Sequence, residues 1–117
     1  MSAPSAAAAR EVRNTAPVFA ALGDVTRLRI VGRLATGEPL SIATLTAGTG
    51  VTRQAITKHL GVLDEAGLVH SEWRGRERLW ALNTARVDAA RRSLDRIAAQ
   101  WDAALLRLKS FVEEPAP

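Results

Sequence analysis

The chain has 117 residues, the size of one domain, and 47% of them are hydrophobic, as in a folded globular protein. It has no cysteine, which excludes disulfides, thiolate metal sites and thiol redox chemistry. Its 16 basic and 12 acidic residues leave a net charge of +4, a weak indication of a polyanionic partner. The sequence shows neither a secretory signal nor a membrane-spanning run, so we expect a soluble, cytoplasmic protein without a membrane partner.

The start of the chain carries the signals of an arm and two helices. Residues 1–14 are small and rich in alanine, and we expect them to form a flexible N-terminal arm. Thr15 then caps the first predicted helix, which stops at Gly23. Asp24 caps the second, whose apolar positions recur at helical spacing until Gly37.

The next two predicted helices are joined by a tight turn. Ser41 begins a short third helix, and residues 47–50, Ala-Gly-Thr-Gly, form a turn because two glycines so close together stop a helix. Thr52 caps a fourth helix, which stops at Gly67. Two helices joined in this way indicate a helix-turn-helix.

The fourth predicted helix, residues 52–66, has an apolar side and a polar side. The apolar side consists of Ile56, Leu60 and Leu63. The opposite side consists of Gln54, Thr57, Lys58 and Gly61. Arg53 stands at the N-terminus, where unpaired N–H groups attract phosphate. Amide, hydroxyl and ammonium groups can read base edges, so we favour insertion into a major groove over the alternative, a plain solvated face.

After this helix the pattern changes from helical to extended. Residues 68–73 and 78–83 have strand character, and residues 74–77, Arg-Gly-Arg-Glu, join them in a hairpin. The arginines around its tip are Arg74, Arg76 and Arg78. Such a tip can lie on the DNA backbone or enter a narrow minor groove. The alternative is a charged edge that prevents strand aggregation, with Glu72 and Glu77 paired to these arginines.

Helical spacing returns at Thr84 and holds to about Val112, before a frayed tail over residues 113–117. Apolar residues recur there in steps of three and four, the pattern of a coiled-coil seam. The seam consists of Val87, Ala90, Leu94, Ile97, Trp101, Ala104, Leu108 and Phe111, widened by Leu105 and Val112.

At 1.5 Å per residue, this last helix has a length of roughly 40 Å, which is too long for the rest of the chain to cover. We expect residues 87–94 to face the body of the protein and residues 101–111 to face a second copy, although the helix could also fold back entirely on its own domain. The predicted dimer interface consists of Val18, Phe19, Leu94, Ile97, Trp101, Ala104, Leu105, Leu108 and Phe111.

Together these elements predict a mainly α fold with a small β-hairpin, in the order α-α-α-α-β-β-α. This is the order of a winged helix-turn-helix, here with a long C-terminal dimerisation helix. We assign DNA binding and dimerisation to one domain over residues 15–112.

Four segments resemble the ArsR family of bacterial winged-helix repressors, and the resemblance extends over about residues 16–112. They are residues 23–30, GDVTRLRI; residues 52–60, TRQAITKHL; residues 63–69, LDEAGLV; and residues 74–80, RGRERLW, with Trp80 where the family often has tyrosine. The resemblance implies a homodimer that binds a palindromic operator upstream of the genes it represses. It also implies that His59 lies at the helix edge, near the DNA backbone. The predicted DNA-contacting residues are then Thr52, Arg53, Gln54, Thr57, Lys58, His59, Arg74, Arg76 and Arg78.

Many members of this family sense metals, but the ligands for this are missing here. The third helix has no cysteine, and the last one has Asp88, Asp95 and Asp102 but no histidine. The two histidines of the chain, His59 and His70, lie far apart in sequence. We therefore predict no metal and no cofactor.

The three tryptophans, Trp73, Trp80 and Trp101, could line a pocket for a small molecule, but we favour a packing role for them. A small-molecule effector stays open and unidentified.

The function that the sequence favours is a DNA-binding transcriptional repressor. The alternative is a winged helix used only for contact with other proteins. An enzyme is not expected, since the chain has no nucleophile–base pair, phosphate-binding loop or paired carboxylates.

Overall fold

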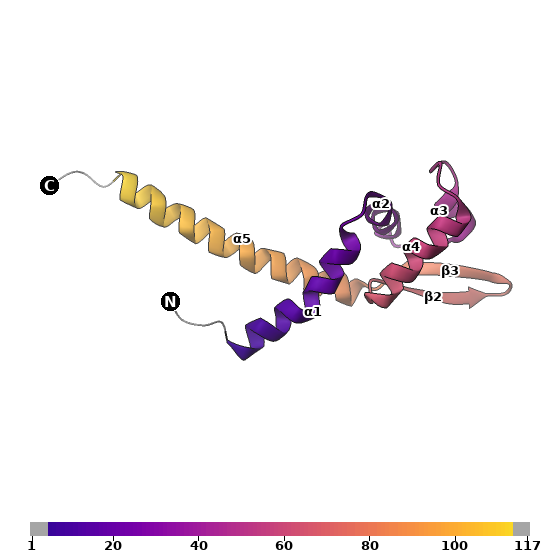
Figure 1. Cartoon of the computed structure of the whole chain (residues 1–117), viewed down its shortest axis with the longest axis horizontal. Helices are drawn as coiled ribbons and strands as arrows, with labels where there is room; N and C mark the ends of the chain where they lie inside the picture. Colours follow the sequence, from indigo (N-terminus) through magenta and orange to yellow (C-terminus); the bar gives the residue numbers. More distant parts are fainter. Residues whose placement is uncertain (1–4, 114–117) are drawn as a thin grey trace.

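The computed structural model describes residues 5–113 and contains five helices and one small sheet in that range (Figure 1). The elements are α1 (Ala6–Leu22), α2 (Val25–Leu34), β1 (Leu40–Ser41), α3 (Ile42–Thr46), α4 (Arg53–Glu65), β2 (Val69–Arg74), β3 (Glu77–Leu82) and α5 (Thr84–Glu113). The predicted winged helix-turn-helix with a long last helix is confirmed, and β1 is added to it.

Three of the predicted helix starts are confirmed by their caps. The side chains of Asp24, Ser41 and Thr52 each accept a hydrogen bond from the backbone N–H three residues further on, at 3.0–3.1 Å. The stops predicted at Gly37 and Gly67 follow α2 and α4 closely, and both glycines have positive φ angles, 101° and 77°.

The start of α1 corrects the prediction of a flexible arm over residues 1–14. The helix begins at Ala6, and Ser5 Oγ accepts a hydrogen bond from the N–H of Ala8. Thr15, predicted as the cap, lies inside the helix, and its hydroxyl donates to the Glu11 carbonyl. Alanine has the highest helix propensity of any residue, so the run of alanines favours a helix. The prediction gave more weight to Pro17, because proline is common in the first turn of a helix. The part of this arm over residues 1–4, and the predicted tail over 114–117, lie outside the described residues.

The sheet is antiparallel, with the strands in the order β1-β3-β2. The hairpin pairs Val69 with Leu82 at its base and Arg74 with Glu77 at its tip, which leaves a two-residue turn. Gly75, the first residue of this turn, has a φ of 63°, as a type II′ turn requires. Strand β1 was missed because two residues are too short to show any periodicity.

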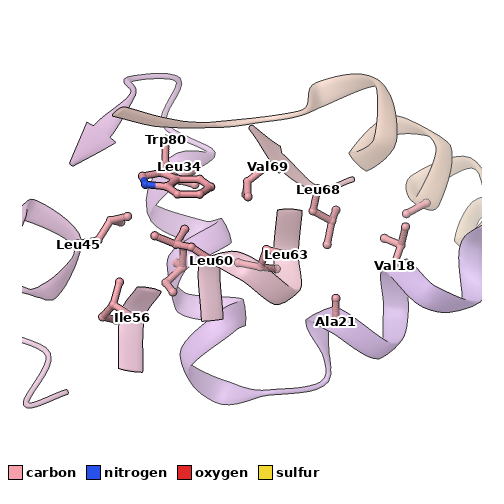
Figure 2. Close-up of a cluster of buried hydrophobic side chains, with 12 residues drawn as sticks. Val18, Ala21, Leu34, Leu45, Ile56, Leu60, Leu63, Leu68, Val69 and Trp80 are labelled. Carbon is pink, nitrogen blue, oxygen red and sulfur yellow. The ribbon is translucent and has the colours of Figure 1, made fainter. Parts of the chain in front are cut away.

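The core lies between the helices and the inner face of the sheet, and α4 runs through it (Figure 2). The predicted inward stripe of Ile56, Leu60 and Leu63 is fully buried. Around it pack Val18, Ala21, Ile30, Leu34, Leu45, Leu68, Val69, Trp80 and Ala90. Because α4 is held along one whole side, its opposite side has a fixed orientation.

Helix α5 starts on this body and then leaves it. Ala90 and Ser93 are its buried residues, and Ser93 Oγ donates to Glu11 Oε1 at 3.1 Å. Glu11 also forms an ion pair with Arg96, which ties α1 to α5. Figure 1 shows the C-terminal half of α5 running away from the body, at the end opposite the β2–β3 hairpin. No described helix is long and apolar enough to cross a membrane.

Candidate DNA-binding surface

The outer side of α4 is a polar and basic surface. Arg53, Gln54, Thr57, Lys58 and Gly61 are all exposed, on the side opposite the buried stripe. Helix α4 has no acidic side chain before Asp64, near its C-terminal end. This surface can therefore approach a polyanion without a repulsive charge.

The N-terminal turn of α4 is held rigidly by two threonines. Thr52 caps the helix, and Thr57 Oγ1 donates to the Arg53 carbonyl at 2.8 Å. Because the Thr57 hydroxyl gives its hydrogen to the helix, its free lone pairs can only accept hydrogen bonds from a ligand.

His59 lies at the edge of α4 and turns toward the start of α2. Its Nδ1 is 3.4 Å from Arg27 Nη1 and 3.8 Å from Asp24 Oδ2, and its side chain is mostly buried. Arg27 also donates from Nε to the Ala21 carbonyl at 2.6 Å, so this cluster joins α1, α2 and α4. The structure thus gives His59 a positioning contact within the protein, in addition to its predicted place near DNA.

The environment of Asp24 stabilises its charged form. The Arg27 backbone N–H donates to the carboxylate and lowers the pKa of Asp24, partly opposed by desolvation. The nearby side chains of Arg27 and His59 lower this pKa further.

The three arginines of the wing, the hairpin of β2 and β3, are not equivalent. Arg74 lies 3.7 Å from Glu72, which is one of the pairings that the alternative interpretation of the hairpin predicts. Arg78 donates from Nε to Ser71 Oγ at 2.8 Å and lies 4.7 Å from the centre of the Trp80 ring. Arg76, in the turn, is exposed and makes no ion pair within residues 5–113. It is the arginine best placed to contact a ligand beyond the tip.

The three tryptophans do not all have the packing role that we predicted for them. Trp80 is 4% exposed and belongs to the core, as predicted. Trp73, which pairs with Arg78 near the wing tip, is 67% exposed, so the packing role predicted for it is wrong. Trp101 on α5 is 63% exposed within its own chain, and its place at the dimer interface stays a prediction. The position of Trp73 at the end of a strand, next to the arginines of the turn, is the signal that could have revealed it.

The predicted dimer residues also divide into two groups. Val18 is 1% exposed in the core of its own chain, so it is not available to a partner, and its assignment to the interface is corrected. Phe19 is half-buried beside it. On α5, the predicted residues are exposed except for the half-buried Ala104.

Comparison with known proteins gives the family. A family model described as a helix-turn-helix domain matches residues 22–72. The chain is 39% identical over 93 residues to the HTH-type transcriptional regulator Rv2034 of Mycobacterium tuberculosis, covering 80% of this chain and 83% of that protein. It is 41% identical over 76 residues to the uncharacterized HTH-type transcriptional regulator YuzN of Bacillus subtilis, covering 60% and 83%.

Solved structures show the same relationship. An ArsR-like transcriptional regulator from Rhodococcus sp. RHA1 superposes with a TM-score of 0.73 at 39% identity, covering 88% of this chain and 96% of that one. The winged helix-turn-helix domain of Mb0332 from Mycobacterium bovis, described as homodimeric and as a possible ArsR-family regulator, has a TM-score of 0.62 at 27% identity, covering 86% and 91%.

The fold and the outer surface of α4 define a transcriptional regulator with a helix-turn-helix DNA-binding fold. The curated relatives are regulators rather than enzymes. The chain belongs to the ArsR family of winged helix-turn-helix transcriptional regulators.

Proposed function

We propose that the protein is a sequence-specific repressor that binds a palindromic operator as a homodimer and acts in the cytoplasm. The observation that carries this proposal is the exposed side of α4, which is polar, basic and free of acid from Arg53 to Leu63. The opposite side of the helix is fully buried, so the residues of the exposed side have fixed positions from which they can enter a major groove.

The residues of α4 have separate tasks in this proposal. Gln54 pairs with the major-groove edge of adenine, and Lys58 reaches guanine or phosphate. Thr57 accepts a hydrogen bond from a base amino group, since its own hydrogen is given to the helix. Thr52 and Arg53 meet phosphate at the helix N-terminus, and His59 holds α4 against α2 at the edge of the surface.

The wing supplies contacts outside the major groove. Arg76 enters the minor groove or lies on the backbone, while Arg74 and Arg78 add positive charge behind it. We add Trp73 to this surface, because a tryptophan so exposed beside the tip can pack against deoxyribose or the edge of a base step.

The homodimer is supported by the seam of α5 and by the homodimeric relative from M. bovis. Within residues 5–113 the side chains of this seam from Leu94 to Phe111 are exposed, except for the half-buried Ala104. We propose that the interface consists of Phe19, Leu94, Ile97, Trp101, Ala104, Leu105, Leu108 and Phe111. A two-fold axis through it would place two α4 helices about 34 Å apart, in successive major grooves. Residues 15–112 remain our proposal for the unit that carries both activities.

We infer that no metal ion controls this protein. The support is the donor set: the chain has no cysteine, and α5 carries Asp88, Asp95 and Asp102 with no histidine beside them. Addition of Zn²⁺ or Ni²⁺ should therefore leave DNA affinity unchanged.

Fluorescence anisotropy tests the proposed function. The pure protein is titrated onto the DNA upstream of its own gene and onto a shuffled duplex, at several salt concentrations. We expect preference for the upstream DNA and an affinity that falls steeply as salt rises. Weak binding to both duplexes, equal at every salt concentration, would favour the protein-contact alternative.

Two substitutions separate the contact classes in the same assay. Gln54→Ala should relax base preference, with a loss of about 1–3 kcal/mol on the preferred duplex only. Arg76→Ala should weaken binding to both duplexes and reduce the slope of log affinity against log salt by about one. If neither substitution changed the affinity for DNA, the assignment of α4 and the wing to the DNA-contacting surface would be wrong.

A further inference from the structure

A cavity of about 470 Å³ lies between α2 and the turn of the helix-turn-helix. Its inner wall is the buried apolar group of Ile30, Leu45 and Ile56. Its outer wall is formed by α2 and by Gly48, Thr49 and Val51 of the turn between α3 and α4. Its volume falls in the range of small-molecule pockets, and an apolar floor with a few polar groups at the rim is their usual composition.

Two glycines line this cavity, Gly32 on α2 and Gly48 in the turn. A Cβ atom added to Gly32, which lines it from α2, would meet nothing within 4 Å, and the same is true of Gly48 in the turn. Gly32 lies inside a helix and has no positive φ, so the helix backbone does not require glycine there. This position at the edge of the cavity therefore has room for a larger side chain.

The charge at the rim is positive. Two arginines of α2, Arg29 and Arg33, line the cavity, and no acidic residue does. Arg33 is already engaged, since its Nη1 donates to the carbonyls of Thr44 and Leu45 at 3.0 and 3.3 Å. Arg29, one helical turn earlier, is exposed and forms no ion pair within the described residues. Its guanidinium is free to bind a carboxylate with two parallel hydrogen bonds.

We propose that this cavity binds a small monocarboxylic acid with an apolar body. The body lies on Ile30, Leu45 and Ile56, beside Gly32, and the carboxylate pairs with Arg29. The site is distinct from the surface of α4 that faces DNA.

The position of the site couples it to that surface. The turn that forms its outer wall is held by Thr49, whose hydroxyl donates to the Thr46 carbonyl and accepts from the Val51 N–H. Ile56, in its inner wall, lies in α4 itself. An acid that binds one arrangement of this turn more tightly changes the affinity of the protein for DNA. DNA then changes the affinity for the acid by the same factor. This last step rests on the proposed function, whereas the binding site does not.

The test uses the full chain labelled with ¹⁵N, with 4-phenylbutanoate as the acidic probe and 4-phenylbutan-1-ol as its neutral match. We expect the acid to shift the backbone amide signals of Gly32, Gly48 and Gly50, and to leave those of Gly67 and Gly75 in place. The alcohol should bind about tenfold more weakly. Shifts confined to α5, or no shifts, would overturn the site, and equal affinity for acid and alcohol would overturn the preference for an acid.

Two variants make the result specific. Gly32→Leu fills the cavity from an exposed helix position and should abolish the shifts at Gly48 and Gly50 without weakening the fold. Gly61→Leu, which adds the same bulk at an exposed position of α4 that does not line the cavity, is its matched control for probe binding. Arg29→Gln should reduce the affinity for the acid to that for the alcohol, and Arg13→Gln on α1 is the charge-matched control. Binding that survives both Gly32→Leu and Arg29→Gln would refute the site.

Failure of this proposal is distinguishable from failure of the proposed function. If the protein prefers the DNA upstream of its gene but shows no shifts at the three glycines, the repressor function stands and the acid site is refuted. A chain that shows the shifts but binds both duplexes equally would keep the acid site and lose the repressor.

Discussion

The residues in and around α4 form two groups. Some hold the helix against the rest of the body, and others face away from it. Asp24, Arg27 and His59 belong to the first group, since their contacts join α2 to α4. Gln54 and Lys58 belong to the second and are exposed. Substitutions in the two groups should therefore have separable effects on stability and on DNA binding.

Asp24 gives the prediction for the first group. Asp24→Ala removes the cap of α2 and a charge beside His59, so it should lower the free energy of unfolding at pH 7, measured with urea. The pKa of Asp24 is lowered in the folded protein. Its stabilising contribution is therefore complete above the ordinary pKa of an aspartate, about 3.9, and disappears as the pH falls through the lower pKa of the folded state.

Asp24→Asn is the matched control for this prediction, because asparagine keeps a capping oxygen but cannot titrate. The variant should be more stable than Asp24→Ala at pH 7, and its difference from the wild type should shrink in acid. A difference that stayed constant down to pH 2 would show that the charge of Asp24 does not contribute.

Much at this scale was visible in the sequence because capping is local. Asp24, Ser41 and Thr52 cap their helices through an N–H three residues away, and the chain between cap and donor is fixed by the helix itself. The side of α4 that carries Gln54 followed in the same way from the helical period. The contacts of His59 and the exposure of Trp73 depend on residues distant in sequence, so no local pattern contained them.

The elements were predicted well where a period runs long enough to be seen. Helices α2, α4 and α5 and both strands of the hairpin lie where the periodicity places them. The beginning of α1 was missed because a run of alanine has no apolar period, although each alanine favours the helix. Val18 was wrongly assigned to the dimer interface for a related reason: one face of α1 packs on α4, which periodicity alone does not reveal.

Helix α4 gives a prediction in which stability and binding move in opposite directions. Gly61 lies on its exposed side, and an added Cβ would meet nothing within 4 Å. Gly61→Leu should therefore stabilise the fold by about 1 kcal/mol, because glycine is a poor helix former. The added bulk on the side that we propose faces the groove should reduce DNA affinity at least about tenfold, a loss of roughly 1.4 kcal/mol.

Thermal unfolding and anisotropy measure the two quantities on the same sample. Gly61→Ala should gain the same stability and lose less affinity, since a methyl group projects less far from the helix. Unchanged DNA affinity in Gly61→Leu would mean that another side of the protein faces DNA.

The molecule as a whole consists of a compact body and one helix that extends well beyond it. It measures 75 × 32 × 21 Å, and the outer part of α5 accounts for much of the longest dimension (Figure 1). Trp101 and Phe111 on that part are 63% and 79% exposed. A single helix of this kind is only marginally stable in water, so its seam needs a cover.

Trp101→Asp tests whether a second copy provides that cover. A charge in the centre of the seam should convert the dimer to a monomer in light scattering and lower operator affinity by more than tenfold, or roughly 1.4 kcal/mol. The body of the variant should keep its fold, because Trp101 is exposed within its own chain. Ala99→Asp places the same charge on the opposite side of α5 and should leave the dimer intact. A Trp101→Asp protein that is still dimeric would refute the proposed interface.

The separation of α5 from the body has a consequence for dosage in the cell. If two chains meet only through Phe19 and the exposed seam of α5, pairing obeys mass action, and the dimer is scarce until the protein accumulates. In that range, doubling the number of chains gives about four times as many dimers. The gene under control would then switch over a narrow span of protein abundance, and the threshold would be set by the residues of α5 rather than by those that read DNA.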